Sequence, residues 1–281
     1  MFIKFRVKQK LHKKRIDDWL YFFADETVGN MPALKYDKEK LRLLDFDCEG
    51  RSVYLDRINK TVVKFNKFSR VRAAVKSRLA LNKNKYSLKE EFENLLQLPH
   101  VDFLPDVYAY AVCGGFFSKK EKLIINYFED SITVDKLAES GSVRPEDIAF
   151  NVGDLFMEAW GMGFAHMDPH PKNMLVVDGS YKLIDFECCK IDPDCKDFYF
   201  GFSFGYFYHF WFNKFIAEDV YDQVVWSFVN EKALSLNEEL FSSFYEYFKS
   251  EKVSRRERYK AFSNRNLREK MINGQSLCNI D

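Results

Sequence analysis

The feature that most constrains the fold is a hairpin-like segment with polar residues at both of its ends. Asp168 and Asn173 precede this segment and Asp185 follows it, with short apolar runs on either side of an Asp-Gly-Ser turn at 178–180. This pattern predicts two short antiparallel strands. Because a hairpin returns the chain to the point where it began, we expect all three polar side chains at one end of it.

The chemistry of these three side chains fits phosphoryl transfer from a nucleotide. A carboxylate can orient an attacking hydroxyl and accept its proton, which is the role predicted for Asp168. Carboxylate and amide oxygens are hard ligands of the kind that magnesium selects, so Asn173 and Asp185 are the predicted metal ligands. Pro169 and Pro171 fix φ at two positions and stiffen the loop that carries the base. The alternative is that the acid and the amide only cap a turn.

The sequence His-Met-Asp-Pro-His-Pro-Lys-Asn at 166–173, followed by Ile-Asp-Phe at 184–186, resembles the signature of the protein-kinase-like superfamily. That superfamily includes lipid, sugar and aminoglycoside kinases. The resemblance implies an α+β, bilobal protein-kinase-like fold that uses ATP and Mg²⁺, with a small antiparallel-sheet N-lobe and a larger helical C-lobe. We expect a basic N-terminal extension over residues 1–30, the N-lobe over 31–127 and the C-lobe over 128–281.

The superfamily also has a strand lysine and a helix glutamate upstream of the base. The β-branched run at 60–65 predicts a strand that ends near Lys64, the candidate for contact with the phosphates. Residues 87–98 have their apolar positions on one helical face. Glu91 resembles the glutamate that pairs with the strand lysine, whereas Glu90 is its rival and fits a capping box. Taken alone, each of these charges also fits a solvated surface position.

Two further segments bear on nucleotide binding. The strand-like segment at 122–130 lies where the superfamily connects its lobes, which implies adenine contacts to the backbone around Asn126, Tyr127 and Phe128. Protein kinases cover the phosphates with a glycine-rich loop, but the first hairpin here has a single glycine, Gly50. We therefore expect a plain turn and nearby cations to hold the phosphates.

Several departures from protein kinases concern the acceptor. Glu187 stands where they have glycine, His170 stands where they have lysine, and only twelve residues lead from Asp185 to Asp197. That length is too short for a peptide-docking activation loop, which favours a hydroxyl on a sugar or small molecule. Asp197 either braces the catalytic loop or caps the helix that follows. The charge-free aromatic run at 198–212 is shorter than the ~20 residues of a spanning helix, so it predicts a buried core helix or an interfacial patch.

The charge distribution suggests a surface for anionic lipid. The net charge is only +1, yet the stretch from Arg57 to Lys89 contains eleven basic and no acidic residues. Within this stretch, apolar positions recur with helical spacing and basic residues occupy the other faces, and the N-terminal segment also mixes basic and apolar residues. Segments 1–15 and 67–85 are therefore the predicted contacts with an anionic membrane surface. A solvated basic face is the alternative, and no nucleic-acid-binding motif is found. The six cysteines lack zinc-type spacing and the adjacent pair at 188–189 does not suit a disulfide, which favours a reducing cytoplasm. With the basic segments, this predicts a cytoplasmic location, peripheral at the inner face of the membrane.

Several features together indicate which branch of the superfamily the chain resembles. The Asp-Pro-His-Pro-Lys-Asn sequence, the strand lysine followed by a basic helix, and the membrane-seeking charge resemble the bacterial lipopolysaccharide core heptose kinases. The leading hypothesis is therefore an ATP- and Mg²⁺-dependent kinase that phosphorylates a sugar hydroxyl of a lipopolysaccharide core-type glycolipid. Ile-Asp-Phe-Glu at 184–187 resembles aminoglycoside and choline kinases instead, which makes a soluble small-molecule kinase one alternative. A non-catalytic pseudokinase that binds membranes or partners is another.

Overall fold

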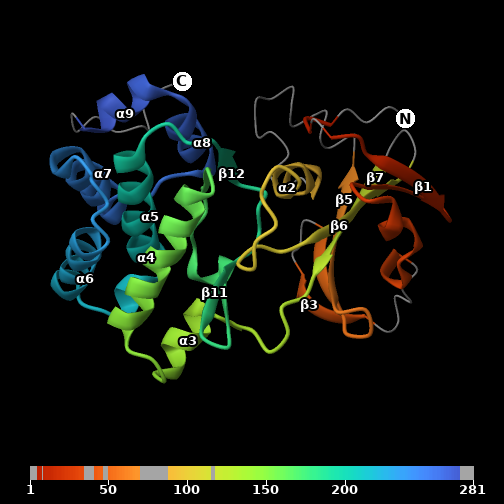
Figure 1. Ribbon diagram of the computed structural model, residues 1–281, viewed down its shortest axis with the longest axis horizontal. Helices are drawn as coiled ribbons and strands as arrows, with labels where there is room; N and C mark the ends of the chain where they lie inside the picture. Colours follow the sequence, from red (N-terminus) through yellow and green to blue (C-terminus); the bar gives the residue numbers. More distant parts are fainter. Residues whose placement is uncertain are drawn as a thin grey trace. The chain divides into compact units, whose positions relative to one another are not determined.

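The computed structural model describes residues 5–7, 9–34, 41–46, 50–69, 88–114 and 118–272. The chain divides into two compact units, the first formed by Met1–Glu129 with Asp185–Glu187, the second by Asp130–Ile184 with Cys188–Asp281. In Figure 1 the main part of the first unit, up to Glu129, runs from red to yellow-green, and the second unit follows from there to blue. The first unit is built on an antiparallel sheet and the second mainly on helices, as expected for the α+β class.

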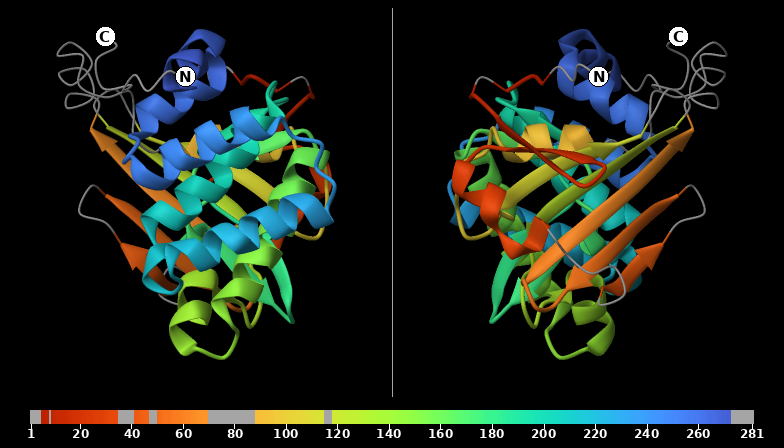
Figure 2. Two further views of the ribbon diagram at one scale, coloured as in Figure 1. Left: turned by 90° about the vertical axis from the view of Figure 1, so that its left-hand side faces the viewer. Right: turned by 90° about the vertical axis from the view of Figure 1, so that its right-hand side faces the viewer.

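The first unit contains one antiparallel sheet, which has seven strands within the described residues. Runs rich in Val, Ile, Tyr and Phe form its central strands, as the β propensities of these residues predict. β5 (orange) and β7 (yellow-green) pair along their whole length and lie side by side in the right-hand view of Figure 2. In spatial order the strands are β1 (His12–Ile16), β2 (Trp19–Phe23), β6 (Val107–Cys113), β7 (Ser118–Asn126), β5 (Thr61–Ser69), β4 (Arg51–Asp56) and β3 (Arg42–Phe46).

Each face of this sheet carries a different layer. Helix α2 (Leu88–Leu95) packs on β5, β6 and β7 through Phe92, which is fully buried. The opposite face bears an apolar cluster around Val63 and Ile124, next to the 3-10 turns η1 (Glu26–Asn30) and η2 (Pro32–Leu34). Because side chains alternate along a strand, Val63 faces this cluster and its neighbour Lys64 faces α2.

The N-terminal segment differs from the expected extension. β1 and β2 form a hairpin whose second strand pairs with β6, so residues 12–23 belong to the sheet and not to a separate basic extension over 1–30. Lys14, one of the cations assigned to a membrane surface, donates to the backbone oxygen of Gly29 at 2.8 Å. β1 lies at the sheet edge, where lysine and arginine side chains protect an unpaired strand.

The second predicted membrane segment lies mostly outside the described residues. Residues 67–69, where the predicted amphipathic helix would begin, are the last residues of β5. Residues 70–87, with the rest of that predicted helix, are not described. The strand that carries Lys64 is therefore longer than the sequence pattern predicted.

The second unit surrounds two small sheets with helices. β8 (Ile132–Thr133), β10 (Met174–Val177) and β11 (Ser180–Leu183) form one sheet, and β9 (Phe164–His166) pairs with β12 (Cys189–Ile191). β10 and β11 are the predicted hairpin, with Val177 opposite Ser180. The helices are α3 (Val134–Ser140), α4 (Pro145–Gly161), α5 (Lys196–Phe210), α6 (Glu218–Glu231), α7 (Glu238–Ser250), α8 (Arg255–Ser263) and α9 (Arg265–Ile272), with 3-10 turns η4 (Pro171–Asn173) and η5 (Phe212–Lys214).

The aromatic helix α5 is the core of the second unit. Every residue from Phe198 to Tyr208 is buried, which confirms the prediction of a core helix. Gly201 and Gly205 let α7 approach α5 closely. A Cβ atom on Gly205, for example, would lie 2.5 Å from the backbone oxygen of Tyr245. Within the described ranges, no helix combines the length and the apolar character that a bilayer span requires.

Candidate functional site

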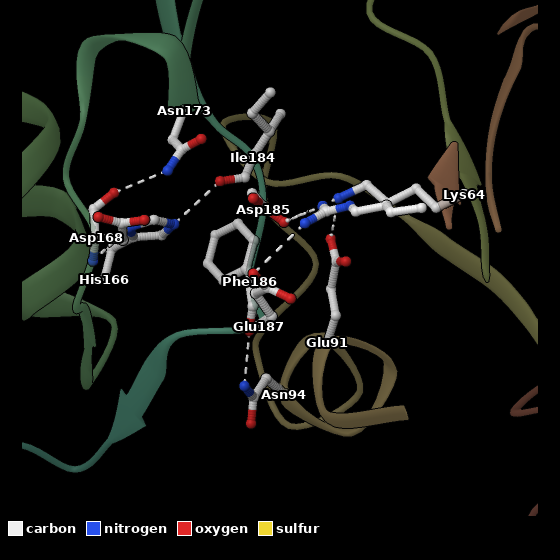
Figure 3. Close-up of polar contacts among 11 residues, drawn as sticks. Lys64, Glu91, Asn94, His166, Asp168, Asn173, Ile184, Asp185, Phe186 and Glu187 are labelled. Carbon is white, nitrogen blue, oxygen red and sulfur yellow. Dashed lines mark hydrogen bonds and ion pairs between the residues drawn. The ribbon is translucent and has the colours of Figure 1, made fainter. Parts of the chain in front are cut away.

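In the first unit, three predicted site residues from distant parts of the chain form one ion-pair group. The ammonium of Lys64 lies 2.6 Å from Glu91 Oε1 and 3.1 Å from Asp185 Oδ1. The Lys64 side chain is 7% exposed and that of Glu91 is fully buried. Figure 3 shows the side chains of Lys64 and Glu91 pointing toward Asp185. The structure thus assigns Glu91, and not its rival Glu90, to the strand lysine.

Opposite charges decide which members of this group stay ionised. Burial disfavours the ammonium of Lys64, but Asp185 and Glu91 outweigh it and raise the pKa of Lys64. Burial likewise disfavours the Asp185 carboxylate, but Lys64 and Arg51 hold its pKa well below the usual range. For Glu91, burial outweighs the attraction of Lys64 and raises the pKa. The group therefore presents a charged lysine and an ionised aspartate at neutral pH.

A second cation, Arg51, joins the group and was not identified from the sequence. Its guanidinium lies 3.1 Å from Asp185 Oδ1 and 3.5 Å from Glu187 Oε1. Arg51 is the first residue of β4 and follows Gly50, whose φ of 96° suits glycine. β4 pairs with β5, the strand that carries Lys64. A basic residue directly after the turn at Gly50 was therefore the sequence signal that could have identified Arg51. Arg51 is thus a cation beside the turn at Gly50, and the expectation that cations here hold the phosphates stays a prediction.

The backbone around Asp185 is held in an unusual conformation. Asp185 has a φ of 68°, a region that residues other than glycine rarely adopt. The next residue, Phe186, is fully buried. Its backbone carbonyl accepts a hydrogen bond of 2.7 Å from Nδ2 of Asn94, a residue of α2. These contacts explain why Asp185–Glu187 belongs to the first unit and not to the expected C-lobe over 128–281.

In the second unit, the loop from β9 to β10 brings Asp168 and Asn173 together. Asn173 Nδ2 donates to the backbone oxygen of Asp168 at 3.0 Å, as Figure 3 shows. The backbone oxygen of Asn173 accepts from Ile184, the residue before Asp185. His166 ties the same loop to the hairpin, because its Nε2 lies 3.0 Å from the backbone oxygen of Ile184. Both ends of the hairpin are therefore fixed to the loop of the base.

The carboxylate of Asp168 has two partners that sequence reasoning missed. The hydroxyl of Tyr206 on α5 donates to Asp168 Oδ1 at 2.6 Å, and Arg258 Nη2 on α8 lies 3.3 Å from the same oxygen. Asp197, the residue expected to brace this loop or to cap α5, does neither. Its carboxylate accepts instead from the backbone nitrogen of Asn237, and the N-cap of α5 is Cys195.

The predicted adenine-binding segment has fewer open donors than expected. The backbone nitrogen of Asn126 donates to Asp106, and that of Tyr127 donates to Lys60, at 3.0 and 2.9 Å. Both donors are thus used within the first unit. Of the three predicted residues, Phe128 is the one whose backbone N–H has no backbone partner within the described residues.

The two predicted magnesium ligands, Asn173 and Asp185, belong to different units, and each offers an oxygen donor of the kind that magnesium takes. The described part of the chain contains no group of three or more His, Cys, Asp or Glu side chains that could hold a metal ion alone. Magnesium usually takes one or two protein ligands and completes its shell with phosphate oxygens and water. Asp185 offers an ionised carboxylate whose two cationic contacts both go to Oδ1. Asn173 uses its amide nitrogen for Asp168, so its amide oxygen is the group left for a cation.

No protein-family model matches the sequence, and a search of the curated proteins finds no match.

Proposed function

We propose that this protein is an ATP- and Mg²⁺-dependent phosphotransferase of the protein-kinase-like class. The observation that carries the proposal is the buried contact of Lys64 with both Glu91 and Asp185. The three residues lie far apart in the sequence, on β5, on α2 and after β11. A buried lysine between two carboxylates is costly to maintain for stability alone. A cation that can exchange a carboxylate for a phosphate has a functional reason to be there.

The residues of the ion-pair group and those of the loop that carries Asp168 each have a role in this reaction. Lys64 and Arg51 contact the phosphates of the nucleotide, and Glu91 keeps Lys64 in place. Asp168 orients the acceptor hydroxyl and accepts its proton as the γ-phosphoryl group is transferred. Asn173 and Asp185 would hold magnesium, which would neutralise charge on the phosphates.

For the acceptor, we propose a sugar hydroxyl on a lipopolysaccharide core-type glycolipid. An aromatic and basic surface next to the loop of Asp168 supports a ring-bearing, anionic acceptor. Lys172 and Lys214 lie over the ring of Trp211, at 5.1 and 3.8 Å from its centroid. His170, two residues after the base, lies 5.9 Å from the same ring. Such a ring offers a stacking surface to a sugar, and the lysines offer charge to a phosphate or carboxylate. A cytoplasmic enzyme at the inner face of the membrane would meet such an acceptor.

The proposal is tested by supplying labelled ATP and Mg²⁺ with four acceptors: core glycolipid, an aminoglycoside, choline and a generic peptide. We expect label on the glycolipid, and none on any acceptor with Asp168→Asn. Label on choline or the aminoglycoside alone would replace the glycolipid with a soluble acceptor. Equal labelling by the wild type and Asp168→Asn would refute the role of the base.

A further inference from the structure

The base has a hydrogen-bonded connection to the C-terminal helices of the second unit. Arg258 Nη1 donates to the hydroxyl of Tyr206 at 2.5 Å, and that hydroxyl donates to Asp168 Oδ1 at 2.6 Å. Arg258 Nη2 also approaches Oδ1 directly, at 3.3 Å. Both partners therefore bind the same oxygen of the carboxylate. The other oxygen, Oδ2, has no partner among the described residues.

Tyr206 is held in this position by the packing of α5. Its neighbour Gly205 lies against the backbone of α7, where a Cβ atom would be 2.8 Å from the nitrogen of Lys249. This close approach fixes the rotation of α5, and with it the direction of Tyr206. The Tyr206 ring is 3% exposed and stacks on Phe210, with the ring centroids 4.3 Å apart. The hydroxyl therefore has little freedom to leave the carboxylate.

Arg258 is similarly fixed by α8. Ser254 and Glu257 form a capping box at the start of this helix, which sets the position of its first turn. Arg258 lies one turn after the cap, is 6% exposed, and has its guanidinium 4.8 Å from the centroid of the Tyr206 ring. Its Nε is buried and has no hydrogen-bond partner among the described residues. The bonds that its guanidinium makes thus go to Tyr206 and Asp168.

We propose that Arg258 and Tyr206 are positioning residues that hold Oδ1 of Asp168 and so direct Oδ2 at the acceptor hydroxyl. This inference rests on the proposed function, because it assigns a purpose to the carboxylate only if Asp168 is the base. The Asp168 side chain is 31% exposed, so an acceptor can reach the oxygen that the protein does not hold. A base that is fixed through one oxygen keeps its other oxygen in a defined direction. Displacement of a catalytic group by about 1 Å can lower the rate about 100-fold.

A purely structural ion pair would have different consequences. The loop is already held by Asn173 and His166, neither of which contacts the carboxylate of Asp168. Loss of Arg258 would then lower the stability of the second unit without changing the turnover of the folded protein. Loss of a positioning residue lowers kcat and leaves the KM for ATP unchanged, because the base acts on the acceptor.

The test compares Arg258→Gln, Arg258→Lys and Tyr206→Phe with Arg256→Gln, an exposed control on the same helix. Turnover of Mg²⁺-ATP is measured with the acceptor labelled in the screen, or with water as acceptor if none is labelled. We expect kcat to fall about 100-fold in Arg258→Gln and about tenfold in Tyr206→Phe, with the KM for ATP within about twofold of wild type. Arg258→Lys restores part of the rate, and Arg256→Gln behaves as wild type.

A double mutant separates this inference from the proposed function. In an Asp168→Asn background, Arg258→Gln should add no further loss, because Arg258 acts through the carboxylate. Wild-type kcat in both Arg258→Gln and Tyr206→Phe, with Asp168→Asn inactive, would overturn the positioning role alone. An active Asp168→Asn would overturn the proposed function together with it. If Arg258→Gln does not fold, Tyr206→Phe, which removes a single hydroxyl, decides the matter.

Discussion

Replacement of Lys64 by methionine should strongly destabilise the first unit. Methionine has a similar length but removes the charge that lies 2.6 Å from Glu91 and 3.1 Å from Asp185. Asp185 keeps Arg51 as a partner, whereas the fully buried Glu91 loses the ammonium that compensates it. Breaking a buried pair by removing one partner costs on the order of 3–5 kcal/mol. We expect Lys64→Met to fall in this range.

The double variant Lys64→Met/Glu91→Leu should recover most of this loss, because the buried carboxyl that lost its partner is removed as well. Chemical denaturation of the single and double variants measures both free energies of unfolding. Lys60→Met is the matched control, since Lys60 pairs with Glu129 at 2.8 Å but both side chains are more than half exposed. A Lys64→Met loss no larger than that of Lys60→Met would refute the buried ion-pair group.

Three further predictions concern other parts of the molecule. Arg51→Gln should weaken ATP binding about tenfold in titration calorimetry, because it removes one of two cations at Asp185; an unchanged Kd would exclude Arg51 from the phosphate site. Burial lowers the pKa of Lys122 to about 7 from 10.5. Between these values the unfolded chain binds the extra proton, so stability should rise with pH by at most about 1.4 kcal/mol per unit, and Lys122→Met should flatten that rise. Gly205→Ala should cost about 1–3 kcal/mol of stability through its clash with Tyr245, whereas Gly161→Ala, with open space around it, should not destabilise.

The sequence predicted those parts of the site that depend on local patterns. The hairpin of β10 and β11 was predictable because its turn and strands are contiguous, and this fixed the place of Asn173. The strand of Lys64 was predictable from its short β-branched run, and the helix of Glu91 was predictable from its apolar periodicity. The contact between these two residues was expected from the resemblance to the protein-kinase-like superfamily, and the structure decided between Glu91 and its rival Glu90.

The residues that sequence reasoning missed depend on long-range packing. Tyr206 and Arg258 reach Asp168 from helices 38 and 90 positions along the chain, and no local pattern marks them. Within a run of aromatic core residues, the one tyrosine that turns its hydroxyl to the base is set by how α5 packs on α7. The strand β1 was missed for a different reason. Its three central residues, Lys13–Arg15, are all basic and exposed, which suggests a solvated segment and also suits a sheet edge.

The central claim is that Asp168 takes the proton of an acceptor hydroxyl while other residues bind the nucleotide. The most direct measurement is single-turnover transfer from labelled ATP by the wild type and by Asp168→Asn, with the Kd for Mg²⁺-ATP measured on the same samples. The account predicts a fall in transfer rate of about 100-fold or more with the Kd within about twofold of wild type. An unchanged transfer rate in a folded, nucleotide-binding Asp168→Asn protein would contradict it.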